Sequence, residues 1–249
     1  MGKISKRRKQ KQHKWLVAGV VLAVIVFCVA IVLMVLAHFG ILPLNHPNAS
    51  ESFVSNAEIK IDETEQLGYD LELQGIGSYA GLYLEDGSND SVSDILMIRI
   101  KNTGEKDLRL ARLSLTYSEF TAEFEITDLP AGRTVMVLEK NRHSYTDESY
   151  LSIALTDIVF FDQQMDVSGE IYEFSGLPGA INVRNCSGSD ISGDIYVYYK
   201  YIADDELYGG ITFRVKVEGG LKAGELRQVT SSHFDPGCCI ILSVTAGEL

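Results

Sequence analysis

The chain has 249 residues, of which 46% are hydrophobic and 22% charged, and its formal net charge is −12 at pH 7. This length and apolar content allow one or two domains with buried cores outside the N-terminal segment. The acidic excess argues against binding nucleic acid or other anionic polymers through the bulk surface. With only four cysteines, the chain is not a disulfide-rich scaffold.

The N-terminal segment predicts a membrane anchor. Residues 1–14 hold seven basic residues and no acidic one, and residues 15–42 contain no Asp, Glu, Lys or Arg. Leu16 to Leu36 alone would form about 30 Å of helix, enough to span a bilayer. Because positive charge stays inside, we expect a single-pass membrane protein with a basic cytoplasmic tail and extracytoplasmic C-terminal domains. A cleaved secretory signal is the alternative, although its apolar core is usually shorter.

Residues 43–56 carry two prolines and several polar residues, which predicts a short stalk linker. From residue 57 onward, apolar and polar residues alternate, and turn residues recur about every ten positions. The predicted strands are 57–61, 81–85, 94–101, 108–117, 120–126, 134–140, 180–185, 193–202, 209–218, 226–234 and 239–246, with a further strand-rich segment at 149–161. This pattern predicts an all-β protein, in which the transmembrane helix precedes two tandem Ig-like β-sandwich domains, 57–175 and 176–249.

Two sets of landmarks recur in the same order and indicate an internal repeat. The first set is Asn102, Gly104, Tyr117, Phe124, Ile126 and Leu129-Pro-Ala-Gly132. The second set is Asn185, Gly188, Tyr199, Phe213, Val215 and Leu221-Lys-Ala-Gly224. An Asn with a nearby Gly tolerates left-handed turn geometry at a strand end, and Leu-x-Ala-Gly would place one Leu in the core before a turn.

Residues 179–234 resemble the FxLYD and CARDB-like β-sandwich modules of Gram-positive surface proteins. Val183-Arg-Asn185, Ile195–Tyr199 and Leu221-Lys-Ala-Gly-Glu225 stand where that family has an Asn-Ser turn, a Tyr-bearing strand and a Leu-x-Pro-Gly-Glu turn. The chain departs from the family at Tyr198-Tyr199-Lys200, where the family has Leu-Tyr-Asp, and at Lys222-Ala223, where it has a proline turn. The resemblance implies a non-catalytic spacer, anchor or interaction module. It implies no specific activity, because fold analogy alone carries none.

Asp86, Ser88 and Asp90, followed by Asp94, place oxygen-bearing side chains at alternating positions, as Ca²⁺ loops do. An EF-hand register would need Gly at the sixth position and Glu at the twelfth, and the chain has neither. A polar hairpin loop is therefore the competing interpretation of this segment. Ca²⁺ at these four residues is the one cofactor that the sequence suggests.

Cys186 lies at the end of a predicted first strand of the second domain, and Cys238 opens its last strand, next to Cys239. First and last strands of a sandwich often neighbour each other, so a disulfide between Cys186 and Cys238, or alternatively Cys239, is geometrically feasible. Free buried thiols are the alternative.

His143 and His233 have acidic residues nearby, but no G-x-S-x-G or H-E-x-x-H motif accompanies them. We therefore expect no catalytic residue and no enzyme activity.

A tyrosine-rich strand carries Tyr196 and Tyr198 on one face and Tyr199 and Tyr201 on the other. One set would fill the core, and the exposed set would offer a stacking platform for a glycan or a partner, unless its exposure is incidental. We expect a non-catalytic binding, adhesion or envelope-assembly role, with the bilayer contacted through residues 15–42 and an envelope protein or wall polymer as partner. A sensor or ligand-binding ectodomain for Ca²⁺ or a small ligand is the alternative.

Overall fold

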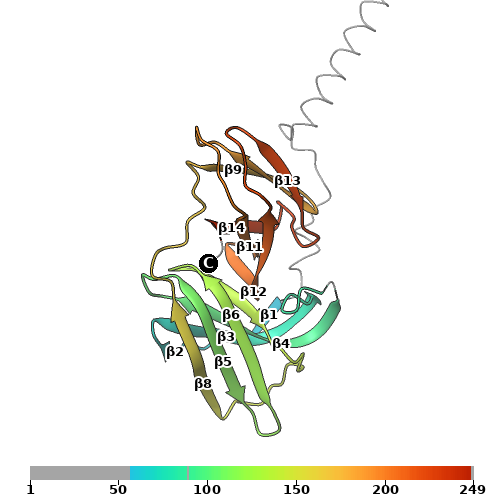
Figure 1. Ribbon diagram of the computed structural model, residues 1–249. Coiled ribbons are helices and arrows are strands. Elements are labelled where there is room, and N and C mark those ends of the chain that lie inside the picture. The colour runs from blue at the N-terminus through green and yellow to red at the C-terminus, as the bar shows by residue number, and fades with distance from the viewer. Residues whose placement is uncertain (1–56, 89, 248–249) are drawn as a thin grey trace, which may run out of the picture. The chain divides into compact units, whose positions relative to one another are not determined.

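The computed structural model describes residues 57–88 and 90–247. All of them belong to one compact unit, residues 49–249. The regular structure of the described residues consists of β-strands only, so the all-β class predicted from the sequence is confirmed for this part of the chain (Figure 1).

The predicted cytoplasmic tail, membrane helix and stalk (1–14, 15–42 and 43–56) lie outside the described residues. Within the described part of the chain, no helix has the length and apolar character that a membrane crossing requires.

The strands in chain order are β1 (Ala57–Ile61), β2 (Glu65–Gly68), β3 (Leu71–Leu82), β4 (Ser91–Asn102), β5 (Leu108–Thr116), β6 (Thr121–Leu129), β7 (Thr134–Leu138), β8 (Ser152–Phe160), β9 (Tyr172–Leu177), β10 (Ala180–Asn185), β11 (Ile195–Ala203), β12 (Glu206–Val217), β13 (Leu226–Thr230) and β14 (Cys239–Ala246). Of these, β2, β9 and most of β3 are absent from the sequence-based prediction.

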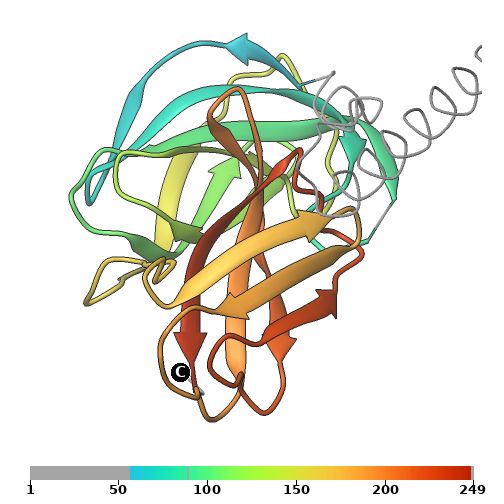
Figure 2. The same ribbon diagram turned by 90° about the horizontal axis from the view of Figure 1, so that it is seen from above.

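The strands form two modules with the same internal order. We call β3–β8 the first module and β9–β14 the second module. In the first module β3-β4-β7 and β6-β5-β8 face each other as two sheets, and in the second module β9-β10-β13 faces β12-β11-β14. Matching strands occupy matching places, because β4 corresponds to β10, β5 to β11, β6 to β12 and β7 to β13. The two modules gather in separate parts of the unit, blue to yellow for the first and orange to red for the second (Figures 1 and 2).

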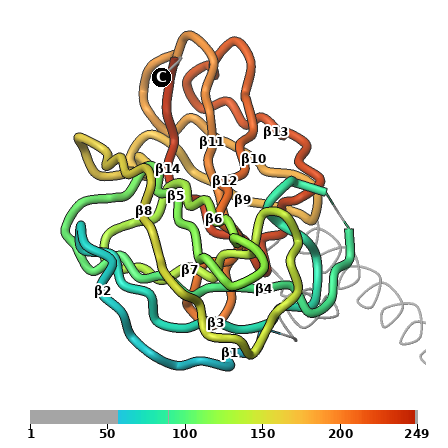
Figure 3. The backbone as a smooth tube through the Cα atoms, turned by 90° about the horizontal axis from the view of Figure 1, so that it is seen from below, coloured from blue at the N-terminus to red at the C-terminus, as the bar shows by residue number. Residues whose placement is uncertain are grey.

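A parallel pairing between β7 and β12 joins the two modules edge to edge. Leu207 pairs with Val135 and Tyr208 with Met136, so that β1-β3-β4-β7-β12-β11-β14, with β2 beside β3, becomes one eight-stranded sheet (Figure 3). The second module begins with β9, which spans the predicted boundary at residues 175 and 176. The division of the chain into two separate domains at that boundary stays a prediction.

The landmarks of the repeat make the same hydrogen bonds in both modules. The buried Asn102 donates from Nδ2 to the carbonyl of Leu129 at 3.2 Å, and the buried Asn185 donates to that of Leu221 at 3.1 Å. Each side-chain oxygen accepts the backbone N–H two residues further along the chain, at 3.1 and 2.9 Å. Each amide therefore ties the end of one strand to the Leu-x-Ala-Gly turn that precedes another.

The two small sheets cover opposite faces of the eight-stranded sheet. Along β11, Val197 and Tyr199 belong to the core of the second module, whereas Ile202 packs against the core of the first. Successive side chains on a strand point to opposite faces, so the two cores lie on opposite sides. The face of β12-β11-β14 that lies on the same side as β6-β5-β8 is therefore left without a sheet of its own module to cover it.

Candidate functional site

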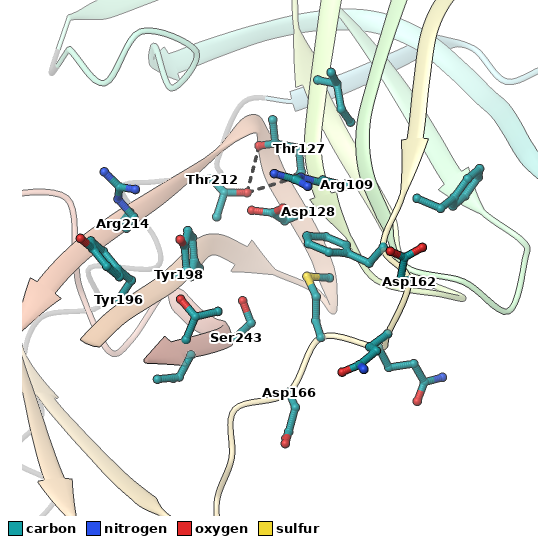
Figure 4. Close-up of a pocket in the computed structure, with 18 of the residues that line it drawn as sticks. Arg109, Thr127, Asp128, Asp162, Asp166, Tyr196, Tyr198, Thr212, Arg214 and Ser243 are labelled. Carbon is teal, nitrogen blue, oxygen red and sulfur yellow. Dashed lines mark hydrogen bonds between the residues drawn. The ribbon is translucent and has the colours of Figure 1, made fainter. Parts of the chain in front are cut away.

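A groove of about 1270 Å³ lies where the edge of β6-β5-β8 meets this open face of β12-β11-β14 (Figure 4). One wall comes from the start of β5, the end of β6, the end of β8 and the connecting segment 161–168. The floor comes from β11, β12 and β14. The groove follows directly from the edge-to-edge joint, because the joint places an uncovered sheet face beside a sheet edge.

Tyr196 and Tyr198 form the middle of the floor. The strand register places Arg214 of β12 and Ser243 of β14 on either side of Tyr198. Tyr196 has Thr245 as its β14 neighbour and is 8% exposed, whereas Tyr198 is half-buried. Neighbours across strands share a face, so aromatic, guanidinium and hydroxyl groups gather on this surface.

Tyr199 and Tyr201 point the other way, as the period-2 pattern predicted. Tyr199 is fully buried in the core of the second module, where its ring stacks on Phe213 at 5.6 Å. Burial raises the pKa of Tyr199 to about 12. Of the pair on the groove side, Tyr198 is thus the tyrosine accessible to a ligand, while Tyr196 is buried beneath Arg214.

Two arginines line the groove, and each lies over an aromatic ring. The guanidinium carbon of Arg214 is 4.9 Å from the ring centroid of Tyr196, and that of Arg109 is 5.9 Å from that of Phe161. Such contacts orient a guanidinium while leaving its N–H edge free for an acceptor. In Figure 4, Tyr198 and Asp128 lie between the two arginines.

Asp128, near the end of β6, contributes the carboxyl group on the wall. Burial raises its pKa, while a hydrogen bond with Thr212 and the charges of Lys200 and Arg109 act in the opposite direction. The wall is held against the floor by Thr127, whose hydroxyl donates to the carbonyl of Gly210 at 3.2 Å and bonds Thr212 Oγ1 at 3.0 Å. The Asp128 carboxyl is therefore a fixed polar group rather than a freely solvated one.

A buried charge network stabilises the joint beneath the groove. The fully buried Lys200 donates from Nζ to the carbonyls of Gly209, Gly210 and Ile211 at 2.9, 2.7 and 2.7 Å. The carboxylate of Glu85 accepts the N–H groups of Gly210 at 2.8 and 2.9 Å and of Leu138 at 2.9 Å. Burial lowers the pKa of Lys200 to about 8, although the charge of Glu85 opposes this shift. Gly209 to Ile211 of β12 are thus held by Lys200 of β11 and by Glu85 of the loop between β3 and β4, and Glu85 also bonds Leu138 of β7.

The structure brings part of the predicted Ca²⁺ loop together, but around a protein cation. Arg142 donates to Asp86 Oδ2 at 2.7 Å and to Asp90 Oδ2 at 2.9 Å, and Ser88 donates its N–H to Asp86 at 2.8 Å. Asp94 uses its backbone carbonyl to accept the N–H of Tyr145. The described residues, which do not include Asn89, contain no group of three or more His, Cys, Asp or Glu side chains suited to a metal ion. Calcium at this loop stays a prediction, and Arg142 would compete with it.

The three described cysteines are free thiols. Cys186 is exposed just after β10, whereas Cys238 is buried in a cluster with Tyr79 and Tyr201. The structure therefore forms no disulfide between Cys186 and Cys238, and the thiol of Cys238 hydrogen-bonds that of its neighbour Cys239.

The two histidines considered as catalytic bases lie apart from the groove lining. Nδ1 of His143 is 3.3 Å from Glu139 Oε2, and its ring packs on Phe120 at 4.5 Å. His233 stacks on Phe213 at 4.7 Å. Within the described residues, neither ring hydrogen-bonds to a Ser, Thr or Cys side chain.

Sequence reasoning singled out the two groove tyrosines but missed Arg109, Asp128 and Arg214. Arg214 was detectable once β11 and β12 were paired, because the register places it beside Tyr198. Arg109 and Asp128 come from the other module and carried no local signal.

Comparison of the chain with family models, curated proteins and solved structures found no match.

Proposed function

We propose that this protein is a membrane-anchored, extracytoplasmic binding protein without catalytic activity, whose ligand occupies the groove between the two modules. The observation that carries the proposal is the floor of the groove, where Tyr198 is accessible between Arg109, Asp128 and Arg214. Aromatic surface with a few convergent polar groups is the usual composition of a ligand site.

The size of the groove favours an extended ligand. Sites for small ligands commonly measure about 300–1,000 Å³, and this groove is larger, at about 1270 Å³. It is also built by two modules rather than enclosed within one. A segment of a polymer or an exposed part of another protein suits such a groove better than a small metabolite.

The sequence supports the envelope setting. The basic tail 1–14 and apolar segment 15–42 have the charge asymmetry of a single-pass anchor with its C-terminal part outside the cytoplasm. Two tandem Ig-like sandwiches after such an anchor, together with the resemblance to FxLYD and CARDB-like modules, favour an envelope protein or a wall polymer as the partner. Adhesion and envelope assembly are the roles that this arrangement would serve.

The test compares capture by the intact protein and by groove variants. Full-length protein in detergent is immobilised and exposed to envelope extract from the source organism, and bound protein and wall material are quantified. Tyr198→Ala should reduce specific capture at least about tenfold, because an aromatic anchor at the centre of a site often carries a large share of the binding energy.

Tyr69→Ala is the matched control, since Tyr69 is 65% exposed in the turn before β3 and outside the groove. It should leave capture unchanged. Equal capture by wild type and Tyr198→Ala would refute the assignment of binding to the groove.

A further inference from the structure

The arginines of the groove differ from the other described arginines in their charge partners. The described residues include eight arginines, and six of them lie within 4.0 Å of a carboxylate oxygen. The six pairs are Arg99–Glu206, Arg112–Glu125, Arg133–Asp205, Arg142–Asp86, Arg184–Glu173 and Arg227–Glu225. Arg109 and Arg214 have no such partner among the described residues, and both line the groove.

Unpaired arginines stand out in so acidic a chain. The whole chain has a formal charge of −12 and its first 14 residues carry +7, which leaves −19 for the remainder. With carboxylates in such excess, an arginine without one is the exception. Both exceptions meet at one groove, where the charge of Arg109 acts on Asp128 but, among the described residues, no carboxylate oxygen lies within 4.0 Å of either guanidinium, so that both can take a carboxylate from a ligand.

The geometry of the two arginines suits planar anions. Arg214 lies over Tyr196 and Arg109 over Phe161, so that a ring supports one face of each guanidinium. The N–H edges remain for acceptors, and a guanidinium bonds a planar carboxylate through two parallel hydrogen bonds.

The groups between the arginines suit a sugar. Tyr198 offers a ring face, and Ser243 offers a hydroxyl group beside it in the same cross-strand row. The Thr245 hydroxyl, one row along, is buried and makes no hydrogen bond with the described residues. A pyranose ring presents an apolar face and several hydroxyl groups, which such a surface can both stack and hydrogen-bond.

A peptide bound by strand addition fits less well. The open edge of the floor is β14, and at Val244 its N–H already donates to the carbonyl of Asp166 at 3.0 Å. The connecting segment thus takes a hydrogen bond that an added strand would need.

We infer that the groove binds an acidic oligosaccharide, with its carboxylates on Arg109 and Arg214 and a sugar ring on Tyr198. This inference rests on the proposed function and names the chemical class of its ligand.

The test is calorimetric titration of the full-length protein in detergent with three probes: an oligogalacturonate, the same oligosaccharide with its carboxyl groups reduced to alcohols, and an oligoglutamate. The oligogalacturonate should bind at least about tenfold more tightly than its reduced form, since hydrogen bonds to charged groups are worth about 1.5–3 kcal/mol. Arg109→Ala and Arg214→Ala should each weaken binding by a similar factor. Arg214→Lys should restore little, because an ammonium lacks the planar fork.

Arg184→Ala is the matched control, because Arg184 is an exposed arginine of β10 outside the groove. It should bind like wild type, and thermal unfolding of every variant verifies that the fold is intact. Equal affinity for the charged and reduced saccharides would overturn the inference while leaving the groove a binding site. Preference for oligoglutamate, or no binding of any probe, would also overturn it, and the capture experiment above would then decide the proposed function separately.

Discussion

The buried amide of Asn185 allows the sharpest test of how the second module is held together. Its Nδ2 donates to the carbonyls of Ser189, Leu221 and Lys222 at 2.8, 3.1 and 3.1 Å, and its Oδ1 accepts the N–H of Ser187 at 2.9 Å. The hydroxyl of Ser187 also donates to Oδ1, at 2.6 Å. Asn185→Ala therefore removes two donating N–H groups, shared among three carbonyls, and two accepted hydrogen bonds, four in all, at a position with no solvent access. At about 1 kcal/mol net for each bond, the free energy of unfolding should fall by about 4 kcal/mol.

The corresponding residue in the first module should matter less. Asn102 donates at 2.9 and 3.2 Å and accepts one N–H at 3.1 Å, so Asn102→Ala should cost about 3 kcal/mol. Asn182→Ala is the control on β10, since this amide bonds only exposed side chains and its loss should cost no more than about 0.5 kcal/mol.

Urea unfolding of the full-length protein in detergent, followed by tyrosine circular dichroism, measures these differences. If Asn185→Ala loses no more stability than Asn182→Ala, the amide does not hold the turn. The matching hydrogen bonds of Asn102 and Asn185 would then make no measurable contribution to the free energy of unfolding.

Three further outcomes are expected. Because Arg142 lies between two loop aspartates, millimolar Ca²⁺ should raise the melting temperature of Arg142→Ala more than that of wild type in calorimetry; equal shifts would contradict this competition. Gly210→Ala should be strongly destabilising in the same assay, since its Cβ would lie 1.8 Å from the backbone carbonyl oxygen of Glu125. Burial raises the pKa of Tyr83 and of Tyr199 to about 12. Their pKa in the folded state lies above the ordinary value of 10, so their contribution to the free energy of unfolding is fully present below pH 10 and is lost as the pH rises from 10 to 12. Unfolding midpoints measured at several pH values would reveal this loss.

Strands β10 to β14 of the second module could be predicted from the sequence because their pattern is local. β10 and β14 begin and end where alternation and turn residues indicate, and β11 is β-branched or aromatic at every position except Lys200 and Ala203. The repeat was also visible, since Asn185 and the Leu-x-Ala-Gly turn are close-range signals that each module needs for the same hydrogen bonds.

The strand β3 was missed because its glycines look like turn residues. At Gly77 a Cβ would lie 2.0 Å from the carbonyl oxygen of Glu58, so the close approach of β1 requires glycine within a strand. The strand β9 was missed for a similar reason, as a Cβ on Gly176 would lie 2.4 Å from the ring of Phe234. Glycine is therefore required at these two positions because each packs closely against a residue that is distant in sequence.

The groove could not be predicted from local pattern. It depends on the parallel pairing of β7 with β12, and parallel pairing joins strands that are far apart along the chain. Lys200 was noted only as a departure from a family signature, and lysine is ordinarily a surface residue. Its burial becomes intelligible only with three backbone carbonyls from β12 around its ammonium group.

The joint between the modules has a mechanical consequence. β7 and β12 share two paired residues, fewer than any other pair of strands in the described sheets. A pull that separates the modules would load this short seam before the longer ones. A ligand lying across the groove would contact both modules. At 100 times its Kd, it would stabilise the state in which β7 and β12 are paired by about 2.7 kcal/mol. Ligand binding would then resist the separation of the modules under force. The β7–β12 pairing that creates the groove would also determine the force at which the ligand is released.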